Sequence, residues 1–91
     1  MKVEITDNAK RDLRRVPEYI LGKFSAWVLL VENHGLAVAR KILGYHDEPL
    51  RGSRKGQRSI RLSRSYRAFY RIKKDKSVEF VSVEEVNKHD Y

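Results

Sequence analysis

Cysteine is absent from the 91 residues, which excludes disulfide bridges, thiolate nucleophiles and zinc sites that need sulfur. Long hydrophobic runs are absent too, since the longest, residues 26–31, is far shorter than the roughly 18 residues that a membrane span needs. The first residues, 1–7, are largely polar and contain no signal-peptide core. We therefore expect one small domain over residues 1–91, located in the cytoplasm and without a membrane partner.

Acidic residues are scarce relative to basic ones, since 12 Asp and Glu accompany 20 Lys and Arg for a net charge of +8. The excess is concentrated between Arg51 and Lys76, where eleven bases accompany a single acid, Asp75. Such a run is often only a solvated surface that aids solubility. We favour nucleic-acid binding, because this run coincides with strand-like sequence and a rigid basic surface loses little entropy when it binds phosphates.

The N-terminal half is expected to hold a short strand and helices. A strand over residues 2–6 precedes a helix that Thr6 or Asp7 can cap and that runs through residue 15. Pro17 interrupts this helix and suits the first turn of the next, which Gly35 ends. The apolar stripe of the first helix consists of Ala9, Leu13 and Val16. The stripe of the second consists of Ile20, Phe24, Trp27, Val28 and Val31. Helical spacing continues over Leu36, Ala39, Ile42 and Leu43.

The C-terminal half changes to a period of two, which indicates strands. Residues 44–49 read as a loop, because Pro49 disfavours helix at Glu48. Three strands follow, separated by turns at residues 63–65 and 73–76, and the last covers residues 78–86. Its two apolar faces are predicted to be Val78, Phe80 and Val86 against Val81 and Val83. The order predicts an α+β fold: an N-terminal strand, a helical hairpin, and a three-stranded antiparallel meander with the helices on one face.

The face of the sheet turned away from the helices is predicted to bind RNA. If Ile60 and Leu62 face the helices, strand alternation places Arg61 on the opposite face. If Ala68, Tyr70 and Ile72 also face the helices, the opposite face gains Arg67, Phe69 and Arg71. Arginines there can bind phosphates while the ring stacks on a base. The same RNA-binding surface is predicted to include Arg51, Arg54, Lys55, Arg58, Arg64, Lys73 and Lys74.

The sequence offers groups for RNA cleavage without a metal or small-molecule cofactor. The histidines lack the short spacing of metal ligands, and no glycine-rich phosphate loop is present. Metal-free cleavage needs a base for the ribose 2′-hydroxyl, cations for the phosphorane, and an acid for the leaving oxygen. Glu48 stands before the basic strands, and His89 follows them beside Tyr91. From the residues alone, Glu48 is better explained as an ion-pair partner of Arg51, and His89 equally well as an exposed terminal histidine.

Four short stretches share a resemblance. They read Glu-Pro-Leu at residues 48–50, Ser-Ile-Arg-Leu at 59–62, Tyr-Arg-Ala-Phe-Tyr at 66–70 and Asn-Lys-His-Asp-Tyr at 87–91. Together they resemble the RelE/ParE superfamily of toxins from type II toxin–antitoxin systems, above all its RelE, HigB and YoeB-type messenger-RNA interferases. The resemblance implies a RelE-like microbial RNase fold and a cognate antitoxin partner. It also implies metal-free, 2′-hydroxyl-driven cleavage of messenger RNA on the ribosome, which inhibits translation.

The resemblance also assigns roles to individual residues. Arg67 matches the arginine that steadies the transition-state phosphate, and Arg61 matches a basic residue that contacts the scissile phosphate. Glu48 resembles the general base and His89 the general acid, while Tyr91 would orient or stack on a base.

Alternatives remain open at this point. His46 competes with Glu48 as the general base. A ParE-like toxin that inhibits DNA gyrase shares the fold without needing these catalytic groups, and a passive module that binds RNA or the ribosome would use the basic surface alone.

Overall fold

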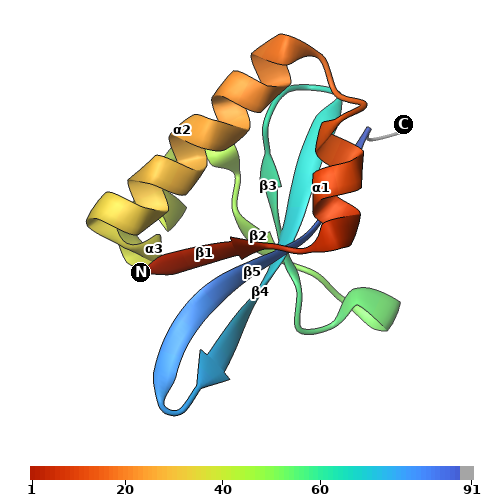
Figure 1. Ribbon diagram of the computed structural model, residues 1–91. Coiled ribbons are helices and arrows are strands. Elements are labelled where there is room, and N and C mark those ends of the chain that lie inside the picture. The colour runs from red at the N-terminus through yellow and green to blue at the C-terminus, as the bar shows by residue number, and fades with distance from the viewer. Residues whose placement is uncertain (89–91) are drawn as a thin grey trace.

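The computed structural model describes residues 1–88, in which three helices pack on a five-stranded sheet (Figure 1). The helices are α1 (Asp7–Leu13), α2 (Glu18–His34) and α3 (Leu36–Arg40). The strands are β1 (Lys2–Ile5), β2 (Glu48–Pro49), β3 (Arg58–Arg61), β4 (Tyr66–Asp75) and β5 (Val78–Lys88). Two 3₁₀ turns, η1 (Leu43–Tyr45) and η2 (Gly52–Arg54), lie in the connections. The predicted α+β class, with an N-terminal strand, helices and then a meander, is confirmed.

The strand order in the sheet is β1-β5-β4-β3-β2. β1 pairs parallel to β5, whereas the other neighbouring strands are antiparallel. The last strand therefore lies between the first strand and the rest of the meander. No helix among the described residues is long and apolar enough to cross a membrane.

Local chemistry explains where α1 begins and where α2 begins and ends. Thr6 caps α1, because its Oγ1 accepts a hydrogen bond from the backbone N–H of Ala9 at 3.1 Å. α1 ends at Leu13, two residues before the predicted end. α2 starts directly after Pro17 and ends at His34, where Gly35 follows with a φ of 87°, in the region that favours glycine.

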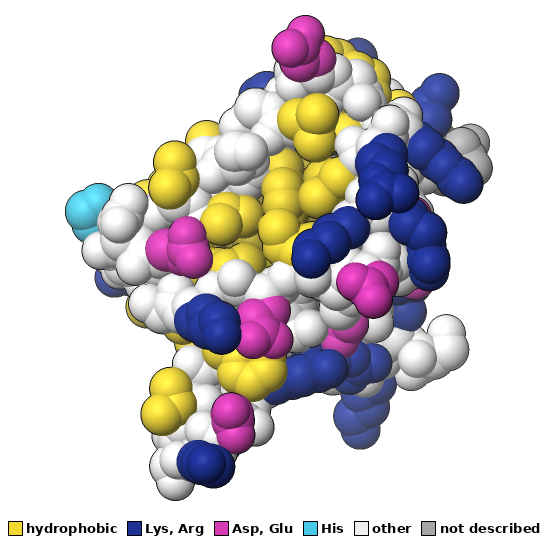
Figure 2. Space-filling model, viewed as in Figure 1, with side chains coloured by type: hydrophobic (Ala, Val, Ile, Leu, Met, Phe, Trp, Pro, Cys, Tyr) yellow, Lys and Arg dark blue, Asp and Glu magenta, His cyan; other side chains and the backbone are white. Residues whose placement is uncertain are grey.

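The core lies between α2 and the sheet. Trp27 of α2 and Tyr70 of β4 are fully buried, and their ring centroids are 5.4 Å apart. Their contact joins the helical layer to the strand at the centre of the sheet. The remaining fully buried side chains include Ala9, Ile20, Val31, Ile60, Val81 and Val83. Figure 2 shows lysine and arginine side chains gathered on one side of the molecule, and hydrophobic side chains visible beside α2.

The helical spacing predicted to continue through Leu43 is wrong beyond α3. α3 packs through Leu36 and Ala39, both buried, and ends at Arg40. Ile42 is partly exposed and Leu43 is 93% exposed. The chain turns there toward the edge of the sheet, so these side chains meet no helix-packing surface.

The predicted loop at residues 44–49 contains an edge strand. β2 pairs Glu48 with Ser59 and Pro49 with Arg58. A proline has no N–H to donate, so it is tolerated on an edge strand but not inside a sheet. This short pairing fixes the position of Glu48 beside β3.

The predicted faces of the last strand are wrong at Val86, because β5 contains a bulge. Phe69 pairs with Glu85 and Tyr70 pairs with Val83, so Glu84 is an extra residue. One extra residue shifts the alternation, and Val86 joins Val83 on the buried face. β5 also runs to residue 88, past its predicted end.

Side chains around α1 satisfy the backbone groups at this bulge. The carbonyl of Glu84 accepts hydrogen bonds from Thr6 Oγ1 and Asn8 Nδ2, each at 3.2 Å. The N–H of Val86 donates to Asp12 Oδ2 at 3.0 Å. The bulge and α1 therefore hold each other in place.

The predicted turn at residues 73–76 is shorter than expected. β4 continues through Asp75, and only Lys76 and Ser77 turn the chain, with φ values of 51° and 77°. Two central residues with positive φ are typical of the tight turns that match strand twist. Lys73 and Lys74 consequently lie on a strand.

Candidate active site

The segment that enters β2 presents alternate residues to solvent. The side chains of His46 and Glu48 are 56% and 41% exposed, whereas that of Asp47 is 1% exposed. Where the chain enters β2, the side chains of the successive residues Asp47 and Glu48 point in opposite directions. His46 itself has a φ of 45°, a conformation that non-glycine residues seldom adopt.

The carboxylate of Glu48 contacts two other candidate residues. Its Oε2 lies 3.4 Å from His46 Nε2, and its Oε1 accepts a hydrogen bond from Arg67 Nη1 at 3.3 Å. The side chain of Arg67 is 18% exposed and reaches Glu48 from β4. The ion pair between Glu48 and Arg51, which the residues alone suggested, is therefore wrong: the described partners of this carboxylate are Arg67 and His46.

Arg61 lies next to this group. It is the cross-strand partner of Arg67, and such pairs place their side chains on the same face of a sheet. Arg61 is exposed, so a cation of each strand faces the same region of surface. Two guanidinium groups beside one carboxylate leave an excess of positive charge, which suits a phosphate.

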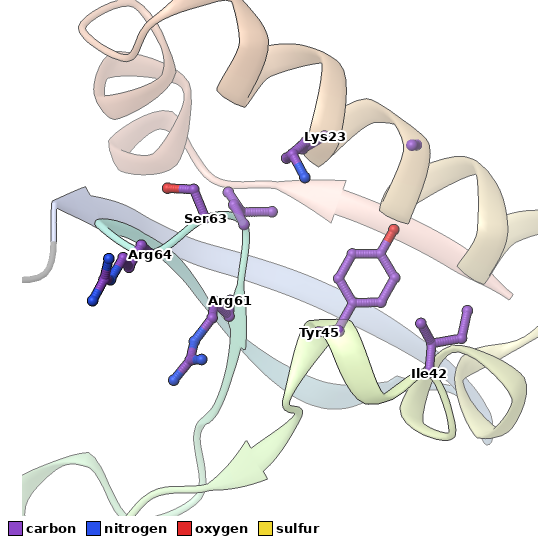
Figure 3. Close-up of a pocket in the computed structure, with 9 residues that line it drawn as sticks. Lys23, Ile42, Tyr45, Arg61, Ser63 and Arg64 are labelled. Atoms are coloured by element: carbon purple, nitrogen blue, oxygen red, sulfur yellow. The ribbon is translucent and has the colours of Figure 1, made fainter.

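Arg61 also borders a groove of about 500 Å³ between α2, η1 and the end of β3. Figure 3 shows Arg61 and Arg64 on one side of this groove, with the ring of Tyr45 pointing toward α2. Burial raises the pKa of the Tyr45 hydroxyl above its ordinary value.

The ring of Phe69 is covered on one side. The guanidinium of Arg54 lies 4.2 Å from the ring centroid, and its Nη2 is 2.8 Å from Glu85 Oε2. Arg54 also donates a hydrogen bond to Gln57 at 3.0 Å. The loop around η2 is thereby fixed over the face of the sheet opposite the helices, and the base-stacking role of Phe69 stays a prediction.

Arg58 has a partner inside the protein. Its Nε donates a hydrogen bond to Asp47 Oδ1 at 2.6 Å, and Asp47 Oδ2 accepts one from the Tyr70 hydroxyl. Burial alone would lower the pKa of Arg58, but the hydrogen bond and charge of Asp47 raise it above its ordinary value. Burial and the same carboxylate raise the pKa of Tyr70 strongly.

The other predicted RNA-binding cations are divided between paired and exposed positions. Arg71 Nε and Lys73 Nζ lie 3.6 and 3.5 Å from the same carboxylate oxygen of Glu84. The exposed positions are Arg51, Lys55 and Lys74. Contacts of all these residues with RNA remain predictions.

Two predicted catalytic residues, His89 and Tyr91, lie outside the described residues. Within residues 1–88, no group of three or more acidic, histidine or cysteine side chains is arranged to hold a metal ion. The feature that the sequence did not reveal is the buried Asp47. The only signal in the sequence was the run of three polar residues, 46–48, before Pro49, and such runs are common in loops.

The fold is that of the RelE-like α+β toxins. The family model described as ParE toxin of type II toxin-antitoxin system, parDE, matches residues 3–86. The chain belongs to this family and is a toxin of a type II toxin–antitoxin system.

Solved structures share this fold at low sequence identity. YafQ from Escherichia coli strain BL21(DE3) superposes with a TM-score of 0.75 at 18% identity, covering 97% of this chain and 92% of that chain. A YoeB/ParE toxin from Agrobacterium tumefaciens gives 0.74 at 20% identity, covering 99% and 100%. The toxin–antitoxin complex RelBE2 from Mycobacterium tuberculosis gives 0.67 at 28% identity, covering 97% and 96%. A search among curated proteins finds no significant match.

Proposed function

We propose that this toxin is a metal-independent endoribonuclease that cuts messenger RNA on the ribosome. One observation carries the proposal: the carboxylate of Glu48 lies within 3.4 Å of His46 and 3.3 Å of Arg67, with Arg61 directly across the strand pair. A proton acceptor beside two phosphate-binding cations on an exposed surface is what cleavage at a ribose requires.

In this mechanism Glu48 takes the proton of the ribose 2′-hydroxyl, with His46 as the competing base. The 2′-oxygen then forms a bond to phosphorus, and the bond from phosphorus to the 5′-oxygen breaks. Arg67 and Arg61 stabilise the negative charge of the phosphorane. The leaving oxygen takes a proton from an acid, for which His89 is the predicted residue. The products are a 2′,3′-cyclic phosphate and a 5′-hydroxyl.

The proposed partners are the ribosome with its messenger RNA and a cognate antitoxin, in the cytoplasm. The similar solved structures include toxin–antitoxin complexes, among them RelBE2, DinJ-YafQ from Escherichia coli and YoeB-YefM from Staphylococcus aureus. The run between residues 51 and 76, rich in arginine and lysine, suits an antitoxin segment with acidic residues.

The experiment adds purified toxin to a translation extract, maps the new 5′ ends of a reporter messenger RNA and identifies their chemical groups. The wild type should produce 5′-hydroxyl ends, and Arg67→Ala should reduce their formation by about two to three orders of magnitude. Arg15→Ala is the matched control, because it removes an exposed arginine from the turn between α1 and α2, outside the proposed site. Intact messenger RNA with the wild type would refute the proposal.

A second function is favoured by the family itself, since the matching model is that of ParE toxins. In that case the chain inhibits DNA gyrase. A supercoiling assay with the same preparation separates the two: inhibited supercoiling with intact messenger RNA favours gyrase. Binding to ribosomes without either effect favours a passive module.

A further inference from the structure

Asp47 stands between two exposed candidate residues but points into the protein. Its side chain is 1% exposed, while its neighbours His46 and Glu48 lie at the surface. A buried carboxylate is costly unless it is well paired. The contacts of Asp47 therefore show which elements hold residues 46–48 in place.

Both oxygens of Asp47 are occupied by partners from other elements. Oδ1 accepts from Arg58 Nε of β3 at 2.6 Å and lies 4.0 Å from Arg40 Nε at the end of α3. Oδ2 accepts from the Tyr70 hydroxyl of β4 at 2.5 Å. A single side chain thus ties the segment before β2 to two strands and a helix.

The anchor on β4 is rigid. Tyr70 is fully buried, and its ring packs against the fully buried Trp27. On the other side of Asp47, the backbone of His46 has a φ of 45°. An unfavourable conformation of this kind persists only where the surrounding structure holds it.

We propose that Asp47 is a positioning residue, which holds the segment so that His46 and Glu48 stay within reach of Arg67. It touches no substrate and acts through its neighbours. The role in catalysis rests on the proposed ribonuclease activity, whereas the placement of the segment does not. A displacement of about 1 Å in a reacting group costs up to about 100-fold in rate.

The test compares Asp47→Asn and Tyr70→Phe with the wild type. Tyr70→Phe keeps the ring against Trp27 and removes only the hydroxyl that Asp47 accepts from. For both variants we expect kcat of RNA cleavage to fall about 10- to 100-fold while KM changes less than about twofold. Asp75→Asn is the matched control, because this carboxylate is exposed on the β4–β5 hairpin. It should leave kcat unchanged.

A second measurement does not depend on activity. In NMR spectra, the Cε1–H signal of His46 and the Nε–H signal of Arg67 should shift in both variants and stay in place in Asp75→Asn. The indole N–H of Trp27 should stay in place in Tyr70→Phe, which reports an intact core.

The outcomes separate the two hypotheses. If the His46 and Arg67 signals and kcat are unchanged in both variants, the positioning role is refuted. The positioning role is also refuted if kcat falls only in proportion to the loss of folded protein while the signals of the folded fraction stay unchanged. If the wild type does not cut RNA but the signals shift, the proposed function fails and the positioning role stands.

Discussion

At the scale of single residues, the candidate site depends on which charges are left without compensation. Glu48 neutralises part of the charge of Arg67, and Arg61 adds a second positive charge directly across the strand pair. The positive charge that remains faces solvent, where a phosphate can reach it. Two other acids of the sheet, Glu84 and Glu85, are engaged with Arg71 and Arg54.

Replacing Arg67 by lysine should show that geometry matters as well as charge. Lysine keeps the positive charge but loses the planar fork with which arginine binds two oxygens. We expect Arg67→Lys to slow RNA cleavage by at least about 100-fold under single-turnover conditions. Arg15→Lys makes the same change on the helical side and should cleave at the wild-type rate. Full activity of Arg67→Lys would mean that charge alone suffices.

The buried hydroxyl of Tyr70 should make the protein sensitive to alkali. Its pKa is raised above the ordinary value of 10.0, so the protonated form is favoured in the folded state. This contribution is fully present below pH 10.0 and is lost as pH rises toward the pKa of the folded state. Urea unfolding should therefore show a fall in stability above pH 10.0 that is smaller in Tyr70→Phe.

Tyr19→Phe is the control for this measurement, since the side chain of Tyr19 is 59% exposed. The control should retain the wild-type loss of stability in alkali. An alkaline loss of equal size in Tyr70→Phe would show that other groups cause it.

At the scale of secondary-structure elements, strong periodicity predicted more than short or irregular segments did. α2 and the strand around Tyr70 were predictable, because an apolar stripe over several helical turns, or a sustained alternation of apolar and polar residues, determines which side is buried. The bulge at Glu84 was not, since it depends on how β5 aligns with β4. β2 was missed for the same reason: two residues carry no period, and they become a strand only by pairing with β3.

The same distinction applies to the candidate site, where positions on regular strands were predictable and a contact that depends on β2 was not. Strand alternation placed Arg61 and Arg67 on one face, and the register confirms their pairing. The resemblance assigned separate roles to Glu48 and Arg67, but their contact came only from the structure, because it requires β2 at the edge of the sheet.

Removing the acceptor at the bulge should loosen the contact between α1 and β5. In Asp12→Ala the buried N–H of Val86 loses its partner, which typically costs about 1–3 kcal/mol. Urea unfolding measures the change in free energy. Lys10→Ala, an exposed change on the same helix, should alter it by less than about 0.5 kcal/mol. Equal stabilities of the two variants would show that this hydrogen bond contributes nothing.

At the scale of the whole molecule, the excess of positive charge is concentrated in one part of the chain. The region between residues 51 and 76 carries eleven bases and one acid, and the rest of the chain carries nine bases and eleven acids. Binding to RNA is therefore expected to weaken steeply with salt, because each neutralised phosphate releases counterions.

The salt dependence can be assigned to individual cations. For a single-stranded RNA, Lys55→Gln should reduce the slope of log Kd against log salt concentration by about 0.7 if Lys55 contacts a phosphate. Lys10→Gln, which removes a lysine from α1, should leave the slope unchanged. A slope near zero for the wild type would rule out phosphate contacts as the basis of binding.

The position of β5 between β1 and β4 has a consequence for how the toxin folds during its synthesis. Every other described element leaves the ribosome before β5, and the parallel pairing of Lys2 with Phe80 joins residues that lie far apart in the sequence. Such distant pairing forms late. The nascent chain therefore cannot complete its sheet until residues 78–88 have left the ribosome, because both β1 and β4 need β5 as their neighbour.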